Sequence, residues 1–247
     1  MNIEYEIYNP GGNITALVID NNYNKKDIKN INNYLLKKYK QVEQVAFLDI
    51  DKNELKMAGG EFCVNAARCA LYYSINNFNK DEITFLDKKI RGIIDKDYIS
   101  MKYDINKKLN DIIKTNDKTI VSLNGISIVI LDKETNDLLL KQKSMNKIKS
   151  ILESLNINEK ALGIVLIDDY TIDPYIWVKA IDTLYNETAC GSASIATAIY
   201  YYLKTNYKEY RIIQPSKEEL KIKLNIKNNI LKNIEIEGTI KKTKKTD

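Results

Sequence analysis

Apolar positions along the chain follow two different periods, and the switches between them divide it into strands and helices. Apolar residues recur at every second position in short runs and at every third or fourth position in longer ones. In the first half a turn at Asn9-Pro10-Gly11-Gly12 separates two strands. The whole pattern there predicts strands at 3–7, 17–19, 42–50, 54–57, 83–86 and 90–103, with helices at about 28–36 and 63–76.

The second half repeats this order of elements. An Asn124-Gly125 turn joins two apolar runs and predicts a β-hairpin. One helix is expected from the apolar positions Leu138, Met145, Ile148, Ile151, Leu152 and Leu155, and another from Cys190 onward. Strands are predicted at 120–123, 126–131, 163–167, 175–181, 211–214, 220–224 and 230–236. The repeated order predicts a duplicated α+β unit with its seam near 105–118.

Composition places the chain among ordinary globular proteins. It has 247 residues, 44% hydrophobic and 29% charged, which is enough for one large domain or two smaller ones. The net charge of +5 is spread along the chain, and the basic run at 241–245 is interpreted as a solvated tail. Because no basic face with stacking aromatics is evident, nucleic acid is not expected as a partner.

Neither a membrane span nor a disulfide framework is expected. The chain has no apolar stretch of 18 residues and no basic-then-apolar start, so we expect a cytoplasmic protein. Three cysteines make an odd count without a repeated spacing. Histidine is absent, which removes the usual proton-transfer residue and disfavours a metal site. No metal or cofactor is expected, because the proton exchange between two thiols described next requires neither.

Two cysteines lie at matching places in the two halves, each at the start of a predicted helix. Cys63 follows Glu61 by two residues, Cys190 follows Glu187 by three, and small residues come after both. A helix N-terminus has unpaired N–H groups and a positive dipole end, which lower a thiol pKa and bind carboxylates. Two such ends facing each other could exchange an α-proton between two thiols. The glutamates could position the substrate ammonium.

The simpler interpretation of a helical cysteine is a small buried hydrophobe. That interpretation is adopted for Cys69, which lies six residues after Cys63 on another side of the helix. For Cys63 and Cys190 the repeated context, with Glu ahead and small residues behind, favours chemistry instead.

At these residues the chain resembles diaminopimelate epimerases and the wider superfamily of cofactor-independent amino-acid racemases. Residues 63–69, Cys-Val-Asn-Ala-Ala-Arg-Cys, are similar to the family's Cys-Gly-Asn-Gly-x-Arg-Cys, and 187–193, Glu-Thr-Ala-Cys-Gly-Ser-Ala, to its second signature. Gly11-Gly12-Asn13 resembles the N-terminal Gly-Asn turn. Gln44 lies where the family usually has a Gln after the first helix. Asn124 resembles an Asn at the start of the family's second domain.

The resemblance implies an α+β fold of two pseudosymmetric domains, each a β-barrel-like mixed sheet around a central helix, with the site in the cleft. The domains would be 1–113, carrying Cys63, and 114–247, carrying Cys190, with a C-terminal strand at about 234–247 returning to the first. Cys63 and Cys190 would be the acid and base. The implied substrate-binding residues are Asn13, Gln44, Glu61, Val64, Asn65, Asn124, Glu187, Gly191 and Ser192.

Differences from the family pattern limit the range of substrates that we expect. The Arg that binds a distal carboxylate in diaminopimelate epimerases is missing from 182–187, and so is an expected Asn near 163–165. Residues 8–13, 43–47 and 60–63 are closer to the histidine racemases of the superfamily. Val64 replaces a usual Gly, and its branched side chain would crowd the carboxylate site.

We therefore predict a pyridoxal-phosphate-independent racemase acting on histidine. One alternative is a diaminopimelate or lanthionine-type epimerase, and another is a non-catalytic amino-acid binding protein on the same fold. The expected partner is a small amino acid, and a homodimer is left open.

Overall fold

The computed structural model describes residues 3–19, 23–115, 118–132 and 144–243. In that part of the chain, four α-helices accompany one mixed sheet of seventeen strands, which confirms the α+β class. The helices are α1 (Lys25–Lys38), α2 (Val64–Phe78), α4 (Met145–Ser154) and α5 (Gly191–Thr205). The strands are β1 (Tyr5–Asn9), β2 (Thr15–Ile19), β3 (Gln44–Asp49), β4 (Glu54–Met57), β5 (Glu82–Phe85), β6 (Lys88–Asp95), β7 (Tyr98–Lys108), β8 (Ile113–Lys114), β9 (Thr119–Leu123), β10 (Ile126–Asp132), β11 (Ala161–Asp168), β12 (Thr171–Val178), β13 (Thr183–Asn186), β14 (Glu209–Ile213), β15 (Glu219–Lys227), β16 (Ile230–Thr239) and β17 (Lys241–Thr243).

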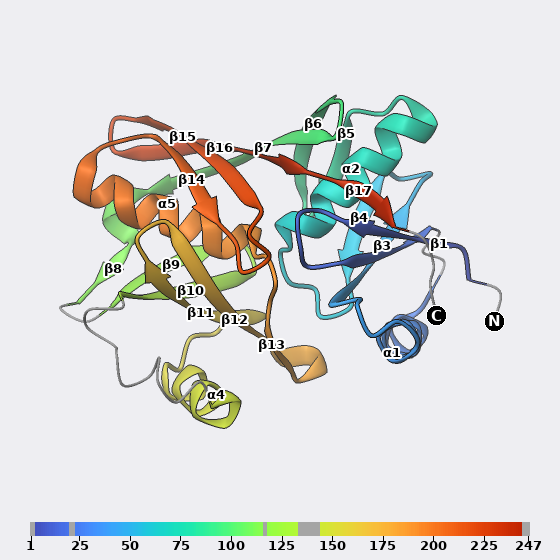
Figure 1. Ribbon diagram of the computed structural model, residues 1–247, viewed down its shortest axis with the longest axis horizontal. Helices are drawn as coiled ribbons and strands as arrows, with labels where there is room; N and C mark the ends of the chain where they lie inside the picture. Colours follow the sequence, from blue (N-terminus) through green and yellow to red (C-terminus); the bar gives the residue numbers. More distant parts are fainter. Residues whose placement is uncertain (1–2, 20–22, 116–117, 133–143, 244–247) are drawn as a thin grey trace.

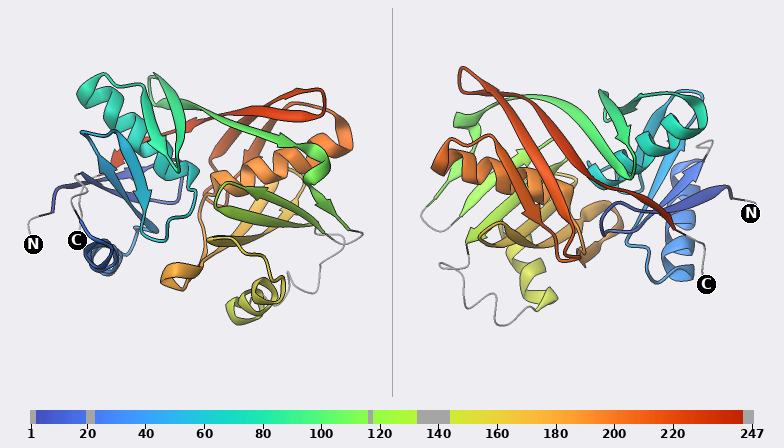
Figure 2. Two further views of the ribbon diagram at one scale, coloured as in Figure 1. Left: turned by 180° about the vertical axis from the view of Figure 1, so that it is seen from behind. Right: turned by 45° about the horizontal axis from the view of Figure 1, so that its top comes forward.

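The strands gather around two buried helices, with long strands running between them. Strands β1 to β6 surround α2 on one side of the molecule, and β8 to β15 surround α5 on the other (Figure 1). Strand β16 pairs antiparallel with both β15 and β7, and these strands span the two sides (Figure 2). Strand β17 pairs with β1, so the last described strand lies beside the first.

Each helix lies between two strands that pair in parallel. Helix α1 connects β2 to β3, and α2 connects β4 to β5. Helix α4 lies between β10 and β11, and α5 lies between β12 and β14, which meet at one residue pair. A parallel pair needs a crossover connection, which a helix supplies.

Small side chains allow α2 and α5 to be buried at the centre of the sheet. Helix α5 begins Gly-Ser-Ala-Ser, and its first ten residues are all buried. Helix α2 buries ten residues, among them three alanines and Cys69. Each helix ends at an asparagine in the left-handed conformation, Asn79 for α2 and Asn206 for α5. Sequence composition therefore accounts for both the burial and the ends of these helices.

The predicted elements are mostly confirmed, with differences where the chain turns or pairs over long distances. The Asn124-Gly125 hairpin joins β9 to β10 as expected. The strand predicted at 90–103 is instead two strands joined at Lys96, which has a positive φ of 55°. The strand predicted at 175–181 ends at Val178, and β13 follows it unpredicted.

The interpretation of the basic run at 241–245 as a solvated tail is wrong for its described part. Lys241 and Lys242 belong to β17, and Lys242 also forms an ion pair with Glu6. Residues 244–245 of that run, Leu138 and residues 116–117 of the predicted seam lie outside the described residues. No helix in the described ranges is long and apolar enough to cross a membrane.

A fully buried arginine ties α2 to segments from both ends of the chain. The guanidinium of Arg68 donates to the carbonyl oxygen of Pro10 at 3.0 Å and to that of Thr239 at 2.7 Å. It also donates to Oδ1 of Asn65 at 3.4 Å. Burial lowers the pKa of Arg68 to about 10, which keeps it charged at neutral pH. The side chain therefore holds the N-terminal turn and the end of β16 against the first turns of α2.

Replacing Arg68 by leucine should lower the free energy of unfolding by about 3 kcal/mol, because buried carbonyl groups lose charge-assisted donors. Urea titration followed by circular dichroism measures the loss. Arg91→Leu serves as the control, since Arg91 pairs with Glu82 on the surface and should change stability little. Equal losses in the two variants would contradict this account of Arg68.

Candidate active site

Both predicted cysteines occupy the same position relative to a helix. Cys63 is the N-cap of α2 and Cys190 the N-cap of α5, each with extended backbone angles. The sulfur of Cys63 accepts from the N–H of Ala66 at 3.4 Å, and that of Cys190 from the N–H of Ala193 at 3.5 Å. These bonds use the N–H of the third residue of each helix, and the other N–H groups of a first turn have no partner within the helix and can bind an anion.

The two helix N-termini meet directly. A Cβ built on Gly191 would lie 2.3 Å from Cγ1 of Val64, so only a glycine fits at the start of α5. The amide of Asn65 donates to the carbonyl oxygen of Ala189 at 3.1 Å, across the same junction. Val64, expected to crowd the site, is therefore packed against Gly191, and this contact fixes how closely the two helix ends approach.

One small cavity lies where the helix ends meet. Its volume is about 30 Å³, which is room for about one water molecule. Both thiols line it, together with every predicted binding residue except Asn124. The sequence did not indicate its apolar wall, which consists of Phe62, Ile126, Ile176 and Val178.

Polar partners hold the two thiols from different sides. The thiol of Cys63 donates to Oε1 of Gln44 at 2.8 Å. Glu187 is hydrogen-bonded to the thiol of Cys190 and to the side chain of Asn13. Two buried acceptors in the cavity lining, Oε2 of Glu61 and Oδ1 of Asn13, have no hydrogen-bond partner among the described residues. Such acceptors suit an ammonium group, which carries three donors.

Burial dominates the ionisation of the site. It raises the pKa of Glu187 to about 8 and that of Glu61 to about 7. Burial, followed by the nearby Glu187 carboxylate, also raises the pKa of Cys63 and of Cys190 above the ordinary range. The expectation of lowered thiol pKa values is wrong for this closed arrangement, because desolvation outweighs the helix N-termini.

Asn124 is the one predicted binding residue outside the cavity. Its amide donates to the carbonyl oxygen of Leu86 at 3.5 Å, and it is also hydrogen-bonded to Tyr103. The adjacent Gly125 has a φ of 83° and packs against the backbone of Phe62. The Asn124-Gly125 turn thus supports the loop before Cys63 without lining the cavity.

Gln214 supports the second cysteine, and sequence reasoning missed it. Its Oε1 accepts from the N–H of Cys190 at 2.9 Å, and its Nε2 donates to Oγ of Ser194 at 2.9 Å. Gln214 is completely buried at the end of β14. A lone glutamine at the end of the strand predicted at 211–214 carries no local signal of this role. Across the described ranges, no group of three or more Cys, Asp or Glu side chains is placed to hold a metal ion.

The fold is that of the PhzF proteins, which is diaminopimelate epimerase-like. A phenazine biosynthesis PhzC/PhzF protein from Clostridium difficile superposes with a TM-score of 0.62 at 13% identity, covering 98% of each chain. A PhzF family protein from Enterococcus faecalis gives 0.60 at 14% identity, covering 98% of this chain and 97% of the other. At these identities the likeness concerns the fold alone.

Sequence comparison defines the family more closely. The profile described as the histidine racemase CntK N-terminal domain matches residues 2–245. Two proteins named histidine racemase, from two strains of Fusobacterium nucleatum subsp. nucleatum, are 29% and 30% identical over 230 residues, covering 84% of each chain. The chain belongs to the histidine racemase family, which is a family of isomerases.

The contact between the helix ends predicts a compensating pair of substitutions. Gly191→Ala should reduce the free energy of unfolding by about 1–3 kcal/mol, because its Cβ overlaps the Val64 side chain. In a protein that already carries Val64→Gly, Gly191→Ala should lower the free energy of unfolding by less, since the overlap is removed. Urea unfolding of both single variants and the double variant measures the coupling. Strictly additive losses would show that the two residues do not limit the approach of the helices.

The raised pKa of Glu187 predicts how stability depends on pH. Between its ordinary value of 4.5 and the folded-state value of about 8, the folded protein holds a proton that the unfolded chain has released. Stability from this group is therefore complete below about pH 4.5 and is lost as the pH rises toward 8. Glu187→Gln should flatten the decline in melting temperature from pH 5 to pH 8. An unchanged slope would contradict this assignment.

Proposed function

We propose that the chain interconverts L- and D-histidine by moving the α-proton between Cys63 and Cys190. The observation that carries the proposal is the shared cavity, in which two N-cap thiols lie at abutting helix ends beside Glu61 and Glu187. Membership of the histidine racemase family and two relatives of that name support the substrate. Neither thiol alone would suffice, because inversion needs a base on one face and an acid on the other.

The substrate's α-carboxylate would bind at the two helix N-termini, where the N–H groups of Asn65, Gly191 and Ser192 are the proposed donors. Its ammonium would bind Glu187, Glu61 and Oδ1 of Asn13. The unpartnered acceptors of Glu61 and Asn13 support this placement. Opposite charges at the two ends then fix the α-carbon between the thiols, which orients its C–H bond for transfer.

In one direction the thiolate of one cysteine removes the α-proton and becomes a thiol. The electron pair of the broken C–H bond passes toward the carboxylate, whose negative charge the helix N-termini stabilise. The other thiol donates its proton to the opposite face of the carbon and becomes a thiolate. The bound ammonium helps form the first thiolate, since its positive charge opposes the effect that burial and Glu187 have on the thiol pKa.

The residues of the cavity wall favour a substrate amino acid with a single α-centre and a flat side chain. Beside the thiols it is formed by Phe62, Ile126, Ile176 and Val178, and no lysine or arginine is among its lining residues. Diaminopimelate would bring a second ammonium and carboxylate to this wall, where they would be left without partners. Because the cavity holds only about 30 Å³, binding of histidine requires the two helix ends to separate and close again.

We also propose that 1–113 and 114–247 are pseudosymmetric halves that move in this way. The repeated order of elements supports this proposal. The parallel strands on either side of α1 in one half correspond to the parallel strands on either side of α4 in the other. The pair around α2 corresponds to the pair around α5, and each of these helices begins after an N-cap cysteine.

The test is deuterium incorporation at the α-carbon of L-amino acids in D₂O, followed by NMR without added pyridoxal phosphate. Histidine should exchange and invert, and diaminopimelate should not. Cys63→Ala and Cys190→Ala should each lose at least about 100-fold in turnover, because general acid–base groups contribute about 10²–10⁴-fold. Cys→Ser variants should also lose most activity, since a hydroxyl is far less acidic than a thiol.

Cys69→Ala is the matched control. Cys69 lies in α2, the helix that Cys63 caps, but is buried in the core and does not line the cavity. This variant should keep its turnover. Near wild-type racemisation by either Cys63→Ala or Cys190→Ala would refute the mechanism. Exchange of diaminopimelate alone would favour an epimerase, and exchange of no amino acid would favour a binding protein.

A further inference from the structure

A hydrogen-bonded contact outside the cavity joins Glu43 to the loop that carries Glu187 and Cys190. Oε2 of Glu43 accepts from the backbone N–H of Thr188 at 2.9 Å, and Oε1 accepts from the Thr188 hydroxyl. The same hydroxyl oxygen accepts from the backbone N–H of Asn13 at 2.7 Å. Thr188 is therefore held by two residues from the other side of the molecule. We call this group of three residues the Glu43 clasp.

The clasp is adjacent in sequence to the partners of both thiols. Glu43 directly precedes Gln44, which accepts from the thiol of Cys63. Thr188 directly follows Glu187, which is hydrogen-bonded to Cys190. A shift of the Thr188 backbone would therefore move Glu187 and Cys190 relative to Gln44 and Cys63.

The loop between β13 and α5 depends on contacts of this kind because it belongs to neither element. Three of its backbone N–H groups have separate acceptors: that of Glu187 donates to the carbonyl oxygen of Pro174, that of Thr188 to Glu43, and that of Cys190 to Gln214. Of these three acceptors, Glu43 alone comes from the α2 side. Pro174 lies on β12 and Gln214 directly follows β14, and both strands are on the α5 side with the loop itself.

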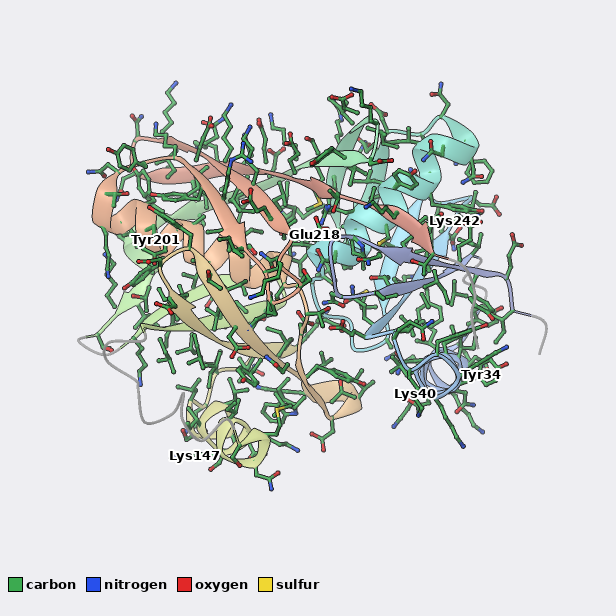
Figure 3. All side chains as sticks on the ribbon, in the orientation of Figure 1. Tyr34, Lys40, Lys147, Tyr201, Glu218 and Lys242 are labelled. Atoms are coloured by element: carbon green, nitrogen blue, oxygen red, sulfur yellow. The ribbon has the colours of Figure 1, made fainter. Side chains whose placement is uncertain are left out.

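Neighbouring contacts reinforce the junction without replacing the clasp. The N–H of Ser216 donates to the carbonyl oxygen of Thr188 at 2.9 Å, and its hydroxyl donates to that of Gly11 at 2.6 Å. Glu218, at the centre of Figure 3, accepts from the hydroxyl of Thr239. A Cβ on Gly12 would lie 2.9 Å from Cβ of Ala189, so the N-terminal turn fits tightly against this loop.

We propose that Glu43 is a positioning residue that holds the Glu187–Cys190 loop closed against Cys63. The proposal deepens the racemase function proposed above and rests on it for its catalytic consequence. Glu43 does not line the cavity, so it acts through Thr188 and not on the substrate. The clasp must open when the helix ends separate for binding, and it re-forms when the two thiols are opposed.

The charge of Glu43 gives the clasp a second measurable effect. The groups that face Glu187 are Cys190, Asn13, Glu43, Glu61 and Cys63, and the carboxylates of Glu43 and Glu61 both raise its pKa. Glu43→Gln removes one negative charge but keeps an acceptor for Thr188. The acidic limb of kcat/KM against pH should then move to lower pH, because Glu187 becomes ionised earlier. A residue with only a structural role would leave that limb unchanged.

The experiment compares Glu43→Ala, Glu43→Gln, Thr188→Val and the Glu43→Ala/Thr188→Val double variant by two readouts. One is the rate at which iodoacetamide alkylates Cys63 and Cys190, followed by mass spectrometry, and the other is kcat for histidine. Glu43→Ala should raise alkylation and lower kcat by about tenfold each, as expected for losing a hydrogen bond to a charged group. Glu43→Gln should stay within about threefold of wild type in both, since its amide oxygen can accept from the N–H of Thr188 while its NH2 group donates to the Thr188 hydroxyl oxygen.

The double variant should differ from wild type in kcat and alkylation rate by no more than Glu43→Ala alone, because both substitutions break the same contact. Glu54→Ala is the matched control, since Glu54 pairs with Lys56 on β4 and does not line the cavity. Wild-type alkylation in Glu43→Ala, or additive effects in the double variant, would overturn the proposal. If the wild-type protein racemised no amino acid, the proposed function would fail, while the alkylation rates would still decide the clasp.

Discussion

The structure depends on the direct contact between the N-termini of two buried helices. Two positive dipole ends approach each other where Val64 meets Gly191, an arrangement that is unfavourable without negative charge nearby. The glutamates of the cavity, Glu61 and Glu187, supply groups that can carry that charge. The positive helix ends and the negative glutamates would together favour a substrate whose carboxylate lies between the helix ends and whose ammonium lies against the glutamates.

Burial works against the ionised forms that the proposed proton transfer needs. Desolvation raises the pKa values of both cavity glutamates and both thiols, so the closed protein favours their neutral forms. An amino acid zwitterion changes this balance, since it introduces one charge of each sign at fixed places. The site is thus suited to become ionised when it is occupied. In the mechanism proposed above, racemisation at neutral pH would then follow from substrate binding and would not require thiols that are permanently ionised.

Contacts distant in sequence keep the helix ends in place. Arg68 binds carbonyl groups at both ends of the described chain, and Gln214 holds the backbone of Cys190. Strand β17 closes the sheet beside β1, which joins the C-terminal segment to the side that carries Cys63. These ties resist the separation of the helix ends that we propose for binding, and such an opening would break polar contacts near Thr188, Asn65 and Ser216.

The sequence by itself determined the α+β class, the helices that begin after Cys63 and Cys190, and all but one of the predicted residues around the cavity. It did so because N-caps, apolar periods and glycine turns are local, and because the two cysteine segments match a known family. Only the tertiary structure revealed β13, the position of Asn124 outside the cavity, and the contacts that Gln214 and Glu43 make. Those features depend on partners far along the chain. The direction of the thiol pKa shifts also needed the structure, since desolvation is set by everything packed around a group.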